Sequence, residues 1–102
     1  MTYGELIKKT RLEAGLKQYQ FADAIGVSKV HISLVEANKS TVGIQLLEKV
    51  AKFKGVPVSV LLWELVTIED VPQENRKLYY QVKPTADMII HNIFKGNEPI
   101  SI

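Results

Sequence analysis

Residues 18–37, QYQFADAIGVSKVHISLVEA, constrain the fold of this chain more than any other segment. Ala22 is small enough for a second helix to pack directly over it, and Gly26 tolerates the positive φ of a sharp turn. Ser28 has a side chain suited to capping the later helix of this pair, which is expected to end near Glu36. Apolar residues that would hold the two helices at a fixed angle recur at helical spacing: Ile25, Val27, Ile32 and Val35. The segment therefore predicts two short helices joined by a tight turn.

Helical periodicity continues on both sides of this segment, and the short connections leave no room for a sheet in residues 1–65. Asn38 is expected to close the third helix in the left-handed conformation, and Pro57 to open the fifth. The expected helices cover about residues 3–14, 17–25, 28–36, 42–54 and 57–63 or 57–65. Their inward faces are expected to carry Tyr3, Ile7 and Thr10, then Phe21, Ala22 and Ile25, then Ile44, Leu47, Val50, Ala51 and Phe53.

Residues 66–102 predict a helical extension of this domain. Two helices are expected, at about 74–81 and 84–94, because the residue before Pro84 avoids the helical region. The tail GNEPISI is expected to be loose. The extension is too apolar for a solvated tail, since it contains Leu78, Tyr79, Tyr80, Val82, Met88, Ile89, Ile90, Ile93 and Phe94. Two interpretations stay open, a dimerisation element or a cap packed on the fifth helix.

Composition excludes several classes of protein. The chain has no cysteine, so disulfides and thiolate metal sites are excluded, and no metal or cofactor is expected. His31 and His91 are far apart in sequence and no glycine-rich phosphate loop occurs, so an enzyme is not expected. The charged N-terminal segment lacks the apolar core of a signal peptide, and no apolar run approaches the roughly 20 residues that span a bilayer. A soluble, cytoplasmic protein is expected.

The net charge of +2 is spread unevenly. Residues 1–65 contain nine Lys and Arg against six Asp and Glu, whereas residues 66–102 contain four against five. This mild basic bias in the first part is compatible with a nucleic-acid partner and does not by itself identify one.

Residues 3–62 resemble the lambda-repressor/Cro family, also called XRE-type regulators. The resemblance rests on GLKQ before the second helix, GVS in the turn, and LLEKVAK followed by GVPVSVLL. The chain departs from the usual pattern at Asn38, where Gly is common, and at Val42, where Pro is common. The resemblance implies an all-α, five-helix DNA-binding domain over residues 1–65, with residues 66–102 as its extension. It also implies that the third helix enters the major groove of double-stranded DNA, with the ends of the second and fourth helices against phosphates.

A helical wheel of the third helix agrees with this orientation. Ile32 and Val35 point one way, and no acidic residue precedes Glu36 on the other side, where DNA phosphates would approach. The outward-facing candidates for DNA contact are Ser28, Lys29, Val30, Ser33 and Leu34, with His31 at the border. Lys29 suits a guanine edge or a phosphate, and Val30 and Leu34 suit thymine methyl groups. The alternative is that the wheel is rotated and the two apolar residues fill the core.

Residues that flank the third helix are candidates for phosphate contacts. Gln18 lies at the start of the second helix, where backbone N–H groups bind anions, and its side chain would also brace the third helix. Lys39, Ser40 and Thr41 precede the fourth helix and are placed to bind a second phosphate; an ordinary helix cap is the other interpretation, and the two roles are compatible. The resemblance aligns Arg11 and Glu36 with a charged pair that links the first helix to the end of the third. Such a pair fixes orientation more than it adds stability.

Two functions follow from these observations. The first is a repressor-like regulator that binds double-stranded DNA as a homodimer. The second is an antitoxin-like protein that represses its own operon and binds a partner protein through residues 66–102.

Overall fold

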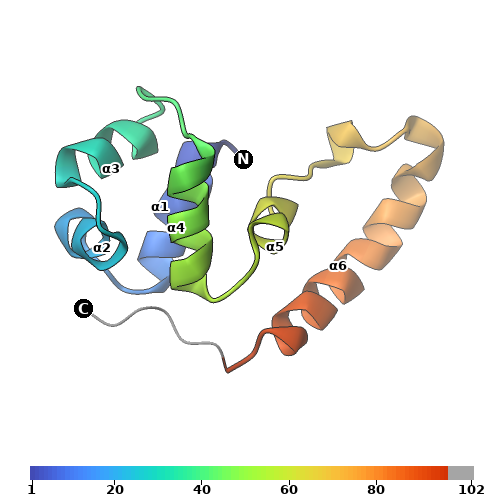
Figure 1. Ribbon diagram of the computed structural model, residues 1–102. Coiled ribbons are helices and arrows are strands. Elements are labelled where there is room, and N and C mark those ends of the chain that lie inside the picture. The colour runs from blue at the N-terminus through green and yellow to red at the C-terminus, as the bar shows by residue number, and fades with distance from the viewer. Residues whose placement is uncertain (97–102) are drawn as a thin grey trace.

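Helix ends in the computed structural model, which describes residues 1–96, follow the local signals of the sequence. Gly26 and Gly55 end their helices in the left-handed region, at φ 76° and 79°. Asn38 also has positive φ, at 58°, as expected after the third helix. The α-helices are α1 (Tyr3–Glu13), α2 (Gln18–Ile25), α3 (Lys29–Glu36), α4 (Ile44–Lys54), α5 (Val58–Trp63) and α6 (Arg76–Ile93), with short 3-10 helices η1 (Ile68–Asp70) and η2 (Gln73–Asn75). No strand occurs in the described part, which confirms the all-α class (Figure 1).

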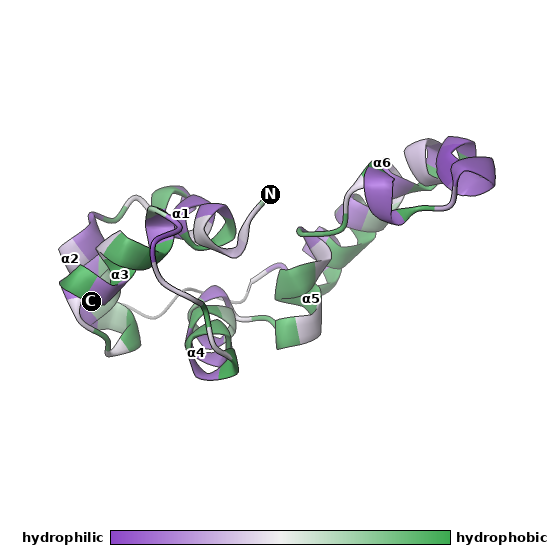
Figure 2. Cartoon of the chain, turned by 90° about the horizontal axis from the view of Figure 1, so that it is seen from above, coloured by the Kyte–Doolittle hydropathy of each residue, from purple (hydrophilic) through white to green (hydrophobic). Residues whose placement is uncertain are grey.

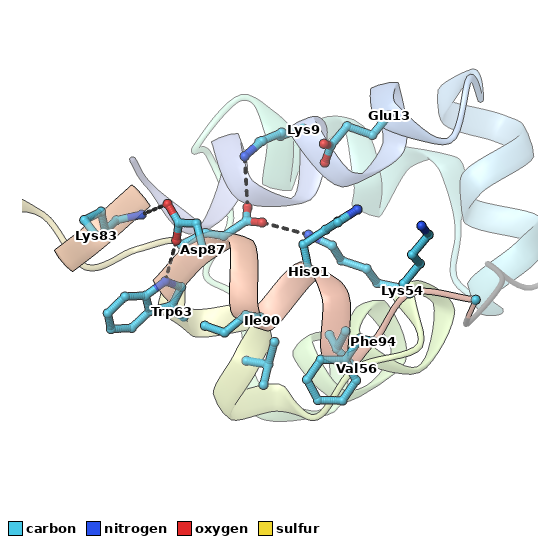
Figure 3. A pocket seen from close by; sticks show the side chains of 14 residues that line it. Lys9, Glu13, Lys54, Val56, Trp63, Lys83, Asp87, Ile90, His91 and Phe94 are labelled. Carbon is cyan, nitrogen blue, oxygen red and sulfur yellow. Dashed lines mark hydrogen bonds and ion pairs between the residues drawn. The ribbon is translucent and has the colours of Figure 1, made fainter. Parts of the chain in front are cut away.

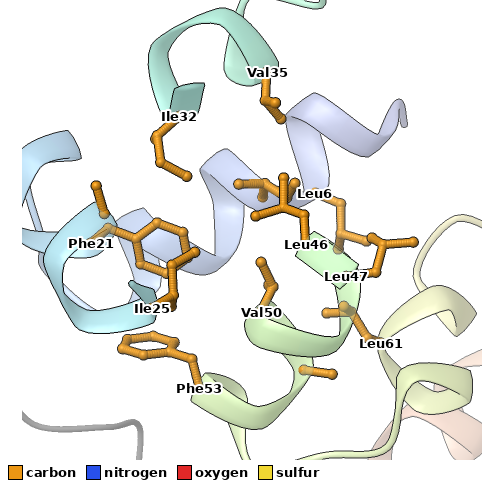
Figure 4. Packing of buried hydrophobic residues seen from close by; sticks show 13 residues of the cluster. Leu6, Phe21, Ile25, Ile32, Val35, Leu46, Leu47, Val50, Phe53 and Leu61 are labelled. Atoms are coloured by element: carbon orange, nitrogen blue, oxygen red, sulfur yellow. The ribbon is translucent and has the colours of Figure 1, made fainter. Parts of the chain in front are cut away.

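Helices α1 to α5 enclose a single apolar core (Figure 4). Phe21 of α2 and Phe53 of α4 meet edge to face, with ring centroids 5.1 Å apart. Most of the expected inward residues are buried, among them Ile7, Phe21, Ala22, Ile25, Ile32, Val35, Leu47, Val50, Ala51 and Phe53. The α2–α3 pair that the sequence predicts is thus anchored on α1 and α4.

The prediction of a buried position is wrong for two of the residues expected inside this core. Tyr3 and Ile44 are exposed, and Leu6 and Leu46 are buried instead. Tyr3 begins α1, and α4 begins at Ile44 rather than near residue 42. Side chains on a helix tilt toward its N-terminus, so the first residue of a helix points past its end rather than onto the neighbouring helix.

The expected break before Pro84 is also wrong, because α6 is one helix of 18 residues with Pro84 inside it. A proline at this position removes a single N–H donor, the one that would bond to the carbonyl of Tyr80. Tyr80 is exposed, so water can replace the missing donor at that carbonyl. The tail expected to be loose, GNEPISI, covers residues 96–102, and all of it except Gly96 lies outside the described part.

Helix α6 lies beside α5 and extends away from the other helices (Figures 1 and 2). None of its residues is buried. The indole N–H of Trp63 donates to Asp87 Oδ1 at 2.7 Å, and Lys83 pairs with Asp87 Oδ2 at 2.6 Å. The Lys83 ammonium also lies 5.5 Å from the centre of the Trp63 ring. These three side chains, which we call the Trp63 clasp, connect α6 to the end of α5.

We expect Gly4→Ala to destabilise the protein, because the end of α3 approaches the backbone of α1 closely at this buried glycine. A Cβ built on Gly4 would lie 2.3 Å from the carbonyl oxygen of Val35 and 2.6 Å from Asn38 Oδ1. Forcing a methyl group into a packed contact costs about 1–3 kcal/mol, which outweighs the gain of about 0.5–1 kcal/mol in helix propensity. Thermal unfolding should show a lower Tm. Lys8→Ala, at an exposed position of the same helix, is the control; equal melting temperatures for the two variants would contradict the close approach.

Candidate nucleic-acid interface

The turn between α2 and α3 is built by local hydrogen bonds. Gly26 adopts the left-handed conformation, and the N–H of Val27 donates to the carbonyl of Ala22 at 3.0 Å. Ser28 then caps α3, since its Oγ accepts from the N–H of His31 at 3.1 Å. These bonds end α2 and reverse the chain, and only three residues separate Ile25 from the start of α3 at Lys29.

Helix α3 has one face in the core and one in solvent. Ile32 and Val35 are completely buried. On the other face Val30 is 65% exposed and Leu34 41% exposed, so the alternative that they fill the core is wrong. Ser28 and Lys29 are exposed with them, while His31 and Ser33 are half-buried. The structure therefore brings together a surface of mixed apolar and polar side chains on α3, and no acidic residue of α3 precedes Glu36.

A buried charged network fixes the far end of α3. Arg11 Nε donates to Glu36 Oε2 at 2.7 Å, and Arg11 Nη2 donates to Glu36 Oε1 at 2.9 Å. The side chain of Glu36 is only 4% exposed. Arg11 Nη1 also donates to the carbonyl of Leu16, and Gln18 Nε2 donates to Glu36 Oε1 at 3.3 Å. One carboxylate thus ties α3 to α1 and to the start of α2, in a bidentate geometry that sets direction as well as distance.

The loop before α4 presents a second group of polar side chains. Lys39 and Thr41 are exposed and Ser40 is half-buried. The N-cap of α4 is Gly43, and no side chain bonds to the first N–H groups of this helix. The interpretation of Ser40 and Thr41 as ordinary helix caps is therefore wrong. The uncapped N–H groups give the start of α4 a partial positive charge.

Two exposed side chains at these helix starts are not among the residues expected from the sequence to contact DNA. Tyr19 follows Gln18 in the first turn of α2, and Ile44 is the first residue of α4. Both are large apolar side chains that project into solvent. Their positions in the sequence, beside the residues already assigned to phosphate contacts, could have identified them.

Metal-ligand clusters and membrane-spanning helices are both absent from residues 1–96. These residues contain no group of three or more His, Cys, Asp or Glu placed to hold a metal ion. None of the helices described here has the length and apolar character that crossing a membrane requires.

Comparisons with known proteins agree with the geometry of the α2–α3 pair. A sequence model of a helix-turn-helix family, HTH_3, matches residues 7–61. The chain is also similar to an immunity repressor protein of Bacillus phage phi105, with 31% identity over 74 residues. This match covers 72% of the chain and 51% of the phage protein, so the chain spans about half the length of that relative. No solved structure matches the chain.

Proposed function

This chain belongs to the HTH_3 helix-turn-helix family, as its resemblance to XRE-type regulators predicts, and from that membership we propose that it is a sequence-specific repressor of transcription. In this proposal α3 enters the major groove of double-stranded DNA. The observation that carries it is the outward face of α3, where Lys29, Val30 and Leu34 are exposed while Ile32 and Val35 are held in the core. The name of the phage relative, an immunity repressor, supports repression rather than activation.

Each exposed side chain of α3 has a chemical counterpart in the groove. Lys29 donates to the O6 and N7 acceptors of guanine or to a phosphate. Val30 and Leu34 contact thymine methyl groups, which explains why apolar side chains face solvent in the free protein. Ser33 and His31 lie at the border of the face and reach phosphate or sugar oxygens.

Phosphates on either side of the groove bind the starts of α2 and α4. The side-chain amide of Gln18 donates one hydrogen to Glu36, and its second amide hydrogen can donate to a phosphate. Lys39, Ser40 and Thr41 face the phosphate that the uncapped N–H groups of α4 attract. These contacts position α3 and carry no sequence information.

Selection of bound sequences from a random DNA pool tests this function. A repressor of this class enriches a short motif, and its affinity for that motif falls steeply as salt releases the condensed counterions. Recovery of no motif, with binding of every duplex to the same extent, would reject sequence-specific recognition and leave only general DNA affinity.

We further propose that the repressor acts as a homodimer held together by α6. One helix-turn-helix contacts too few base pairs to stand out from competing non-specific sites, so two half-sites about one helical turn apart are needed. Leu78, Val82, Ile89 and Ile93 recur on one side of α6, and all four are exposed. Beside them an apolar hollow of about 360 Å³ lies between α6 and Trp63. A symmetric copy of the same stripe is the commonest partner for such a surface.

We expect the double substitution Val82→Asp with Ile89→Asp to convert the dimer to a folded monomer. Each carboxylate would have to be desolvated in the α6 interface, whereas both positions tolerate charge in the exposed monomer. Loss of the linked second half-site lowers operator affinity by roughly a hundredfold or more. Sedimentation measures the association state, and fluorescence anisotropy measures operator binding. The control is Gln81→Asp with Asn92→Asp, which adds the same charge to exposed polar positions of α6.

Sedimentation of the unmodified protein as a monomer at micromolar concentration would contradict the homodimer. The same exposed stripe would then favour the antitoxin-like function, in which a partner protein covers α6.

A further inference from the structure

Trp63 separates two hollows between α6 and the rest of the molecule. With Lys83 it lines the apolar hollow on one side and a larger cleft of about 520 Å³ on the other. The cleft lies between α1, the end of α4, α5 and the last turns of α6 (Figure 3). Cavities of this size at the junction of two structural units are typical of small-molecule sites.

The walls of this cleft differ in chemistry. Ile90 of α6, Phe94 directly after α6 and Val56 lie on one side, and Lys9 and Glu13 of α1 lie on the other (Figure 3). The apolar side offers a surface for a hydrocarbon or aromatic body. The opposite side offers charged groups that would orient such a molecule.

The charged side contains two ammonium groups that share one carboxylate. Lys9 Nζ lies 3.2 Å from Glu64 Oε2, and Lys54 Nζ lies 2.8 Å from Glu64 Oε1. Burial raises the pKa of Glu64, but the hydrogen bonds and charges of Lys54 and Lys9 outweigh it, so the pKa is lowered from its ordinary value. Four lysines (Lys9, Lys54, Lys83 and Lys95) and three carboxylates (Glu13, Glu64 and Asp87) line the cleft, so its formal net charge is one positive. The Glu64 side chain is only 26% exposed, so this charge is less screened than one on the open surface.

We propose that this cleft is a binding site for a small organic anion with an apolar body, such as an aromatic or aliphatic carboxylate or sulfonate. Its anionic group accepts hydrogen bonds from Lys9 and Lys54, and its apolar body lies against Ile90 and Phe94. A molecule bound there contacts both α6 and the α1–α5 bundle, and so fixes their relative orientation.

The site does not depend on the proposed DNA-binding function. It also stays open in the proposed homodimer, because Asp87, Ile90 and Phe94 lie on a different flank of α6 from the stripe that contains Val82 and Ile89. Ligand binding can therefore be measured without DNA and in either association state.

The test uses 8-anilinonaphthalene-1-sulfonate, which joins a sulfonate to an aromatic body. Trp63 is the single tryptophan of the chain and lines both the cleft and the apolar hollow, so energy transfer from it reports a probe bound at either, and the substitutions below distinguish the two. N-phenyl-1-naphthylamine, which has the same aromatic body without the sulfonate, is the matched probe. We expect the anionic probe to bind with one site per chain and roughly tenfold more tightly than the uncharged one, the ratio expected for one charge-assisted hydrogen bond.

Two substitutions at the same ion pair should act in opposite directions. Lys54→Gln removes a positive charge and is expected to weaken binding of the anionic probe about tenfold. Glu64→Gln removes the competing carboxylate, leaves both ammonium groups, and is expected to tighten binding. Lys52→Gln, an exposed position on α4 outside the cleft, is the control and should change nothing. Structural damage would weaken binding in both variants of the pair.

Three results would overturn the proposal. The first is equal affinity of the protein for the two probes. The second is an affinity for the anionic probe in Lys54→Gln and Glu64→Gln that equals that of the parent. The third is loss of probe binding in Val82→Asp with Ile89→Asp, which would place the probe on the exposed α6 stripe.

Discussion

Replacing Lys29, Val30 and Leu34 together by Ala is expected to remove specific DNA binding while leaving the fold intact. The three side chains are exposed in the free protein, so their truncation creates no cavity and strands no buried group. In the proposed complex each contributes a base or phosphate contact worth about 1–3 kcal/mol. Even with partial compensation, affinity for the selected operator should fall by more than about a hundredfold. Fluorescence anisotropy with that operator measures the loss.

Two further measurements distinguish sequence-specific recognition of the operator from non-specific electrostatic attraction to DNA. Affinity for an unrelated duplex should change much less, because only Lys29 contributes a charge and most phosphate contacts remain. Lys8→Ala with Leu12→Ala removes an exposed lysine and an exposed leucine from α1 and serves as the control, with little effect expected on operator binding. If the triple variant binds the operator as tightly as the parent, the reading face assigned to α3 is wrong.

Arg11→Ala is expected to destabilise the protein more than any exposed substitution. The guanidinium donates twice to Glu36 and once to the carbonyl of Leu16, and both charged side chains are almost fully buried. Its removal leaves the Glu36 carboxylate in the interior with only the 3.3 Å hydrogen bond from Gln18. Breaking a buried pair in this way costs about 3–5 kcal/mol. In a domain of this size that lowers Tm by about 4–8 °C for each kcal/mol.

Thermal and urea unfolding measure this effect, with Lys8→Ala as the exposed control on the same helix. A second variant identifies the cause. Arg11→Met combined with Glu36→Leu removes both charges and keeps most of the volume, so it should recover much of the stability that Arg11→Ala loses. Equal melting temperatures for Arg11→Ala and Lys8→Ala would show that the pair does not hold α3 in place.

The sequence by itself determined the α2–α3 pair and the face that α3 exposes. Its signals are local: Gly26 allows the turn, Ser28 caps the next helix, and Asn38 adopts the left-handed conformation that ends it. Each interaction joins residues within one or two helical turns, so the order of residue types is enough to predict it. The inward position of Ile32 and Val35 follows from helical periodicity in the same way. The pairing of Arg11 with Glu36, 25 residues apart, came only from the family resemblance.

Only the tertiary structure decided the features that depend on how helices cross. Periodicity places Tyr3 and Leu6 on neighbouring faces of α1, and the position of α3 and α4 decides which of them is buried. In the sequence, Pro84 predicts the end of a helix. The exposed α6 nevertheless continues through it, because water can satisfy the freed carbonyl. The ion pairs of Glu64 with Lys9 and Lys54 and the Trp63 clasp join residues up to 55 positions apart. Their partners are selected by the packing of α5 between α4 and α6 (Figure 1), which no local preference of the chain specifies.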